Sequence, residues 1–124
     1  MNITITTKNL ELTASIRTFV NKKIGTLAKF LKVFQEKSPE KGKSVAEVFV
    51  EVGKVSKHHR KGEVFFAEIV AMVPGKKLVA KATNENLFSA IREIKDEVEQ
   101  EIKKYKFKKT DIARRQQRKA KKVL

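Results

Sequence analysis

The side chains in this sequence that are best suited to chemistry are lysines and arginines, and they are clustered. Lys and Arg number 29 against 14 Asp and Glu, which gives a net charge of +15. Residues 1–34 carry +5, residues 84–101 carry −4 and residues 102–124 carry +10. Cationic side chains gathered in this way are the electrostatic footprint of a protein that binds nucleic acid.

Three segments supply the candidate contacts to nucleic acid. All charged residues from 14 to 34 are basic, which solvation alone does not require. A glycine-flanked loop at 53–62 holds two adjacent histidines, which are either polar loop residues or contacts to phosphate or base. A basic tail at 109–124 is either a disordered, solubilising end or, as we favour, a phosphate-binding arm that folds on contact. The candidates are Arg17, Lys22, Lys23, Lys29 and Lys32, then Lys57, His58, His59, Arg60 and Lys61, and finally Lys109, Arg114, Arg115 and Arg118.

Catalytic and metal-binding motifs are missing from the sequence. There is no cysteine, no phosphate-binding P-loop, no dinucleotide-binding glycine motif and no serine nucleophile elbow. The acidic residues after position 92 fit a solvated helix face with the pairs Arg92–Asp96, Lys95–Glu99 and Glu99–Lys103. We therefore expect no enzymatic activity, no cofactor, no metal site and no small-molecule substrate.

The periodicity of apolar residues predicts the elements that must hold the cations. Apolar residues in steps of three and four predict one helix over 14–34, capped by Thr13, and another that ends at Tyr105. Thr83 or Asn84 is the expected cap of the second helix. Alternation of apolar and polar residues predicts strands over 2–7, 45–52, 63–73 and 76–82.

These elements give the order β-α-β-β-β-α. Each helix can bury its apolar stripe only against the sheet, so we expect a two-layer α+β domain with both helices on one face of a mainly antiparallel four-stranded sheet. We place this domain at residues 1–108 and a basic, flexible tail at 109–124. The other face of the sheet would carry apolar residues between glutamates, with nothing predicted to cover them.

The sequence also bears on location and on the type of nucleic acid. No apolar run is long enough for a membrane span, and the N-terminus lacks the pattern of a secretory signal, so we expect a cytoplasmic protein with no membrane partner. No helix-turn-helix, zinc finger or RNA recognition motif is visible. Two helices on one face of a sheet are closest to double-stranded RNA-binding domains, which read shape and backbone.

Three blocks of sequence, taken together and in order, resemble a known family. They are LTASIR at 12–17 with FVNKKI at 19–24, HHRKGEVFFAEI at 58–69, and ENLFSAI at 85–91 with IKKYK at 102–106. The chain resembles the ribosome hibernation-promoting factors, also called ribosome-associated translation inhibitors or sigma-54 modulation proteins. The resemblance covers residues 1 to about 108.

The resemblance implies a β-α-β-β-β-α domain that binds rRNA of the small ribosomal subunit, in the channel between head and body. There the protein would compete with mRNA and with A- and P-site tRNA and stop translation, without any enzymatic step. Because the chain ends at Leu124, it resembles the short members, which lack a C-terminal dimerising domain. The remaining alternatives are a general binder of double-stranded RNA or of the nucleoid, and a protein-interaction regulator whose charge serves solubility.

The resemblance also carries over individual contacts to rRNA. Basic residues of both helices make these contacts in the family, whose second helix is often basic in its middle. Here the corresponding segment, 96–101, reads DEVEQE, which departs from the family pattern. The residues that match are Arg17, Lys22, Lys23 and Lys29 on the first helix and Lys103, Lys104, Lys106 and Lys108 at the end of the second.

Overall fold

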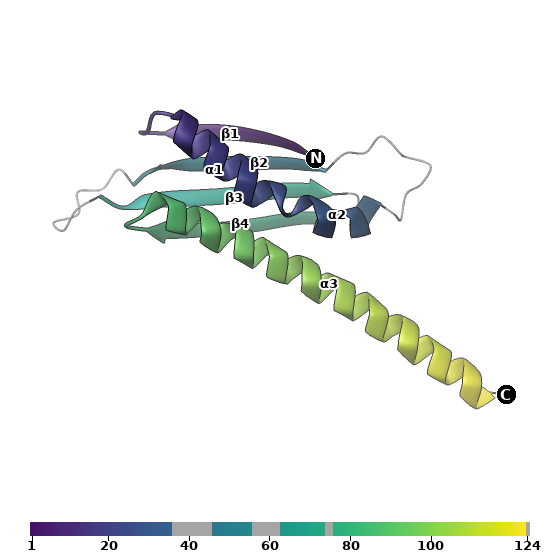
Figure 1. Ribbon diagram of the computed structural model, residues 1–124. Helices are drawn as coiled ribbons and strands as arrows, with labels where there is room; N and C mark the ends of the chain where they lie inside the picture. Colours follow the sequence, from purple (N-terminus) through teal and green to yellow (C-terminus); the bar gives the residue numbers. More distant parts are fainter. Residues whose placement is uncertain (36–45, 56–62, 74–75, 124) are drawn as a thin grey trace.

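The computed structural model describes residues 1–35, 46–55, 63–73 and 76–123, and within these it leaves out the side chains of 32–35 and 106–123. The strands and helices follow the predicted order, except that two helices replace the expected first one (Figure 1). In chain order they are β1 (Asn2–Lys8), α1 (Ala14–Gly25), α2 (Ala28–Gln35), β2 (Glu47–Lys54), β3 (Phe65–Val73), β4 (Lys76–Asn84) and α3 (Leu87–Val123).

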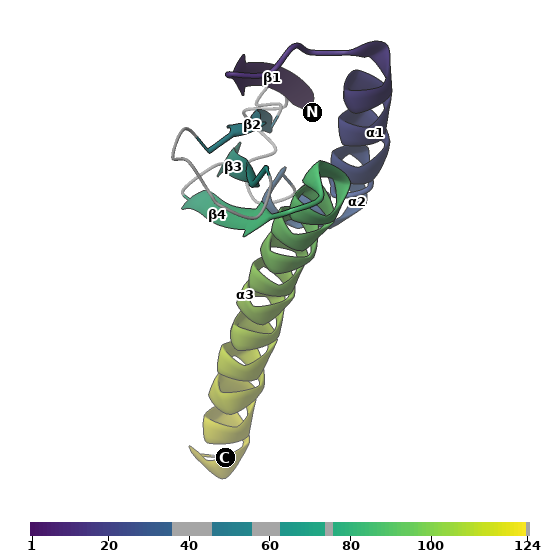
Figure 2. The same ribbon diagram turned by 90° about the vertical axis from the view of Figure 1, so that its left-hand side faces the viewer.

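The four strands form one sheet in the order β1-β2-β3-β4. The β2–β3 and β3–β4 pairs are antiparallel, whereas β1 lies parallel to β2, with Asn2 opposite Glu47 and Lys8 opposite Gly53. All helices lie on the same side of the sheet (Figure 2). The predicted two-layer α+β domain with a mainly antiparallel sheet is therefore confirmed.

The hydrophobic core lies between the sheet and the helices. Every second residue of β2 and β3 points into it, and the apolar stripes of α1, α2 and α3 meet them there. Each Val, Leu or Ile side chain among them, fully removed from water, stabilises the fold by about 1.5–3 kcal/mol. Its largest fully buried members include Val20, Ile24, Leu27, Leu31, Val48, Val50, Ile69, Leu78, Ile91, Ile94 and Ile102.

The first helix is interrupted, which the sequence analysis did not anticipate. Thr13 caps α1 as predicted, since its Oγ1 accepts a hydrogen bond of 3.2 Å from the Ile16 N–H. The helix ends at Gly25 because the Thr26 hydroxyl donates to the Lys23 carbonyl at 2.6 Å, a local bond that competes with the helical ladder. The chain resumes as α2, and the interruption leaves Leu27 fully buried. The prediction of a single helix over 14–34 was wrong.

The last helix also differs from the expected one at both ends. Asn86, not Thr83 or Asn84, caps α3, because its Oδ1 accepts a hydrogen bond of 3.2 Å from the Ser89 N–H. The Asn84 side chain instead accepts from the Asn86 N–H at 2.9 Å and forms the turn before the helix. At its other end α3 runs past Tyr105 to Val123 and extends beyond the sheet (Figure 1). The division into a domain at 1–108 and a flexible tail at 109–124 stays a prediction.

The face of the sheet turned away from the helices, which we call the open sheet face, is only partly polar. Phe49, Met72 and Val79 lie on it and are 42%, 50% and 44% exposed. Among the described residues of the strands, this face carries equal numbers of acids and bases, with Glu47, Glu51 and Glu68 on β2 and β3, and Lys8, Lys77 and Lys81 on the two edge strands. None of the helices in the described part of the chain is long and apolar enough to span a membrane.

Candidate nucleic-acid interface

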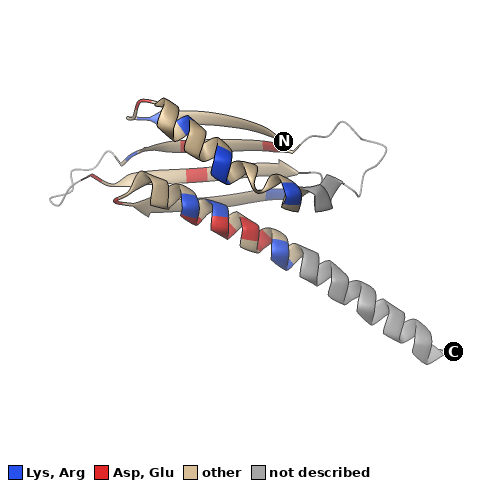
Figure 3. Cartoon of the chain, in the orientation of Figure 1, with Lys and Arg blue, Asp and Glu red and all other residues tan. Residues whose placement is uncertain are grey.

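The outer surface of α1 and α2 carries basic side chains and, from residue 12 to 31, no acidic ones. Arg17, Lys22 and Lys29 are exposed, and Lys23 is half-buried. No acidic residue occurs between residues 12 and 31, so this surface is not neutralised from within its own helices. Figure 3 shows the basic positions along these helices and on α3 below them. Four of the five cations predicted for the first helix therefore lie on one layer of the molecule, and the side chain of the fifth, Lys32, lies outside the described residues.

An aromatic ring of α1 contacts α3 and, at the same time, basic side chains of both helices. The Phe19 ring of α1 packs edge-on against the Phe88 ring of α3, with 4.7 Å between centroids and 80° between planes. The Lys23 Nζ lies 5.9 Å from the Phe19 centroid, and the Arg92 guanidinium carbon lies 5.4 Å from the same centroid. Cations at these distances are attracted by the negative ring face. Arg92 thus reaches from α3 to the basic surface of α1.

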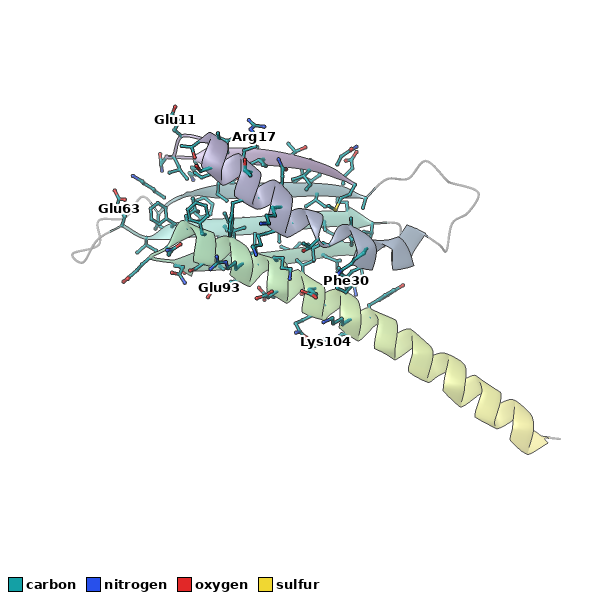
Figure 4. All side chains as sticks on the ribbon, viewed as in Figure 1. Glu11, Arg17, Phe30, Glu63, Glu93 and Lys104 are labelled. Atoms are coloured by element: carbon teal, nitrogen blue, oxygen red, sulfur yellow. The ribbon has the colours of Figure 1, made fainter. Side chains whose placement is uncertain are left out.

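A second ring repeats this arrangement further along the helices. Phe30 projects from α2 toward α3 (Figure 4). Its ring centroid lies 5.3 Å from the Lys29 Nζ and 5.7 Å from the Lys103 Nζ. Lys103 and its neighbour Lys104, both predicted as contacts, are exposed on α3. The structure therefore joins the basic residues of α1 and α2 to those of α3 in one layer.

An ion-pair ladder runs along α3 beside the second ring. The Lys95 Nζ donates to Glu99 Oε2 at 2.8 Å, and the Lys103 Nζ lies 3.4 Å from Glu99 Oε1, so both predicted pairs are confirmed. The hydrogen bond from Lys95 holds the pKa of the Glu99 carboxyl below its ordinary value of 4.5. The same bond raises the pKa of Lys95. Glu99 therefore stays ionised near neutral pH and partly neutralises Lys103.

Acidic side chains interrupt the basic layer in the middle of α3. Glu93, Asp96 and Glu97 are exposed and Glu101 is half-buried. Figure 3 shows acidic positions, in red, along this stretch of α3. The predicted ion pair between Arg92 and Asp96 is not among the salt bridges of the described residues, because Arg92 lies over Phe19 instead. Asp96 Oδ1 lies 3.4 Å from Lys95 Nζ. This segment would repel a phosphate backbone, so the candidate contact surface comprises α1, α2 and the basic residues Arg92, Lys103 and Lys104 of α3.

Many predicted contacts lie outside the described residues. The loop residues Lys57, His58, His59, Arg60 and Lys61 are among them, so their proposed contacts stay a prediction. The backbone of α3 includes Lys106, Lys108, Lys109, Arg114, Arg115 and Arg118, but their side chains are not described. Within the described part of the chain, no group of three or more His, Asp or Glu residues is placed to hold a metal ion.

Sequence reasoning missed Arg92, Phe19 and Phe30 as parts of this interface. Arg92 was assigned to an ion pair on its own helix, although Phe88 also stands four residues before it, on the same helical face. Phe19 likewise stands four residues before Lys23. An aromatic residue four positions before a basic one on a helix was the sequence signal that could have indicated contacts between rings and cations. These rings bring α1 and α3 into contact. That contact depends on the tertiary packing, which the periodicity of apolar residues does not predict.

A shallow hollow on the open sheet face is the alternative site. It measures about 330 Å³ and is lined by Lys8, Glu51, Lys54, Val55, Phe66, Glu68, Lys81 and Thr83. Glu51 and Glu68 stand directly opposite each other across β2 and β3, which is unfavourable for two like charges. Mixed charges of this kind do not select a polyanion, so the helix layer is the better candidate for nucleic acid.

Comparison with known proteins agrees with the fold. The profile of the family described as sigma 54 modulation protein / S30EA ribosomal protein matches residues 3–110. The N-terminal domain of Protein Y from Thermus thermophilus is 24% identical with a TM-score of 0.64, over 85% of this chain and 99% of that one. A ribosomal subunit interface protein from Coxiella burnetii is 13% identical with a TM-score of 0.62, over 86% and 98%. No curated protein sequence matches this chain significantly.

Proposed function

This chain belongs to the sigma 54 modulation protein / S30EA ribosomal protein family, whose members are non-enzymatic, ribosome-associated translation inhibitors, and we propose that it silences translation by binding rRNA of the small ribosomal subunit. It occupies the decoding channel between head and body. From there it competes with mRNA and with A- and P-site tRNA. The proposal places the protein in the cytoplasm, with the ribosome as its partner.

The observation that best supports RNA binding is the basic surface of α1 and α2, which has no acidic residue of its own. Arg17, Lys22 and Lys29 are exposed there without an acidic neighbour from residue 12 to 31. The open sheet face, by contrast, carries equal numbers of acids and bases. A polyanion therefore gains more by facing the helices than by facing the sheet.

The mechanism is occlusion, and it requires only placement. Contacts from lysine and arginine to phosphates fix the orientation of a protein on RNA without reading its bases. The folded domain fills the channel and thereby sterically excludes mRNA and tRNA. The basic residues from 106 onward, whose side chains are not described, add electrostatic attraction. The family description, which names a ribosomal protein, and the name of the Coxiella burnetii structure, a ribosomal subunit interface protein, support a ribosomal partner.

Sedimentation through a sucrose gradient tests this function. The protein is expected to migrate with purified small subunits, and saturation with mRNA and P-site initiator tRNA is expected to displace it. A labelled basic protein of similar charge that does not belong to the family controls for nonspecific attraction. Stable co-occupancy of initiator tRNA and this protein on one subunit would refute the channel. Equal affinity for free duplex RNA would favour the general RNA binder instead.

A further inference from the structure

Two aromatic rings on α1 and α2 each hold two cations, one from the helix of the ring and one from α3. Phe19 is contacted by Lys23 and Arg92, and Phe30 is contacted by Lys29 and Lys103 at the distances given above. Both rings are half-buried. The arrangement is periodic, because Phe19 and Phe30 are eleven residues apart, as are Arg92 and Lys103.

Eleven residues correspond to about three turns of helix, or roughly 16 Å along α3. Residues at this spacing lie on the same face of α3, so Arg92 and Lys103 both point to α1 and α2. The spacing greatly exceeds the ~3.4 Å rise per nucleotide in one strand of a duplex. The two pairs would therefore contact phosphates that are several nucleotides apart or on different strands.

Each ring has two like charges within 5.9 Å of its centroid, and their mutual repulsion is unfavourable unless an anion lies between or beside them. The negative face of the ring reduces this repulsion and restricts the long, flexible side chains. Cations that are restricted before binding lose less freedom when a phosphate arrives. The rings therefore hold the basic side chains, before RNA arrives, in a narrower set of conformations, which lowers the entropy cost of binding.

We propose that Phe19 and Phe30 are positioning residues for two phosphate-binding cation pairs, which we call the Phe19 pair (Lys23 with Arg92) and the Phe30 pair (Lys29 with Lys103). Each pair joins a residue of α1 or α2 to one of α3, so one RNA backbone can contact α3 and the helix beside it at the same time. The inference rests on the proposed function in that the RNA is taken to be ribosomal. Arg92 thereby becomes a contact residue.

The two pairs are not equivalent. Lys103 is also 3.4 Å from Glu99, which competes with a phosphate for it. Arg92 makes no ion pair with any described residue, so the Phe19 pair keeps its full charge for RNA. Loss of the Phe19 ring should therefore weaken binding more than loss of the Phe30 ring.

The test compares Phe19→Leu with Phe19→Trp and with the matched control Phe49→Leu on the open sheet face. Binding is measured to small subunits and, in parallel, to a short RNA duplex, as a function of salt. Phe19→Leu removes the ring but no charge, and we expect about 3- to 10-fold weaker binding from the lost restriction of two side chains. The salt slope should not change, because the number of cations that contact phosphate stays the same. Phe19→Trp should restore the affinity, and Phe49→Leu should change neither value.

A second set of variants covers the case in which Phe19→Leu does not fold. Arg92 is exposed, so Arg92→Gln and Lys23→Gln can be measured singly and together. Each should weaken binding, and the double variant should differ from the sum of the two. Additive effects, or wild-type affinity in Arg92→Gln, would overturn the Phe19 pair.

Failure of the inference and failure of the proposed function give different results. If the wild-type protein binds the duplex but not the subunits, the function is wrong and the ring variants are read on the duplex. If it binds subunits and Phe19→Leu keeps the wild-type affinity, only the inference is wrong. If it binds neither, both are wrong.

Discussion

Removing two cations from α1 gives the sharpest test of which layer faces the RNA. Arg17 and Lys22 are exposed on α1, and neither side chain makes a hydrogen bond, ion pair or ring contact with another described residue. The double variant Arg17→Gln with Lys22→Gln should therefore leave the free energy of unfolding within about 0.5 kcal/mol of wild type. The matched control is Lys77→Gln with Lys81→Gln, which removes the same charge from the open sheet face.

The expected magnitude follows from counterion release. Each phosphate contact contributes about 0.7 to 0.9 to the slope of log affinity against log salt. Two lost contacts should make this slope shallower by about 1.4 to 1.8. Taking 1 M salt as the point at which these contacts vanish, the affinity at 0.1 M falls roughly 25- to 60-fold. The control variant loses only distant, screened attraction, because a Debye length at 0.1 M is about 10 Å.

Affinity for purified small subunits, measured by filter binding at four or more salt concentrations, gives both quantities. Thermal unfolding of each variant shows whether the fold is intact. Equal slopes in the α1 variant and the β4 control would mean that net charge alone drives binding, and the assignment of the helix layer would fail. A steeper loss in the control would place the RNA on the open sheet face.

Three other predictions concern the tail, the core and the pH dependence. Deletion of residues 109–124 removes seven basic groups and one acid, so binding should weaken and its salt slope should become shallower while subunit selectivity survives; a truncated protein with wild-type salt dependence would contradict this. Ile94→Ala, at a fully buried position of α3, should destabilise the fold by about 2–5 kcal/mol in urea unfolding, and a change below 1 kcal/mol would mean that α3 does not cover the sheet. The lowered pKa of Glu99 means that its contribution to stability is present above pH 4.5 and is lost as the pH falls further, so wild type should lose more stability than Glu99→Gln between pH 5 and 3. The same loss in both proteins would exclude the Lys95–Glu99 pair as a source of stability.

The sequence predicted the element types and the two-layer fold because each element has its own apolar periodicity. Strands such as 47–54 alternate cleanly, with Val48, Val50 and Val52 buried and the residues between them exposed. It did not predict the break between α1 and α2, because the apolar steps continue through Leu27 to Leu31 without a gap. The break depends on a hydroxyl of Thr26 that competes for a backbone carbonyl, which periodicity does not register.

The candidate site was predicted as a set of residues but not as an arrangement. Charge counts located the cations of α1 and α2, and the structure places Arg17, Lys22, Lys23 and Lys29 on one layer. The role of Arg92 was missed, because its partner Phe19 is 73 positions away in the sequence. Contacts between residues so distant are set by how α1 and α3 pack on the sheet, and one sequence without tertiary information does not define that packing.

The parallel pairing of β1 with β2 has a consequence for the synthesis of this protein. Parallel neighbours need a long crossover, and here it contains both α1 and α2. The first strand to leave the ribosome must therefore wait for its partner, since Asn2 pairs with Glu47 and Lys8 with Gly53. The sheet face that α3 covers then stays uncovered until the chain has been translated past Ile102. A nascent chain stalled before that point should expose apolar surface and recruit chaperones, and release of the stall should end their association.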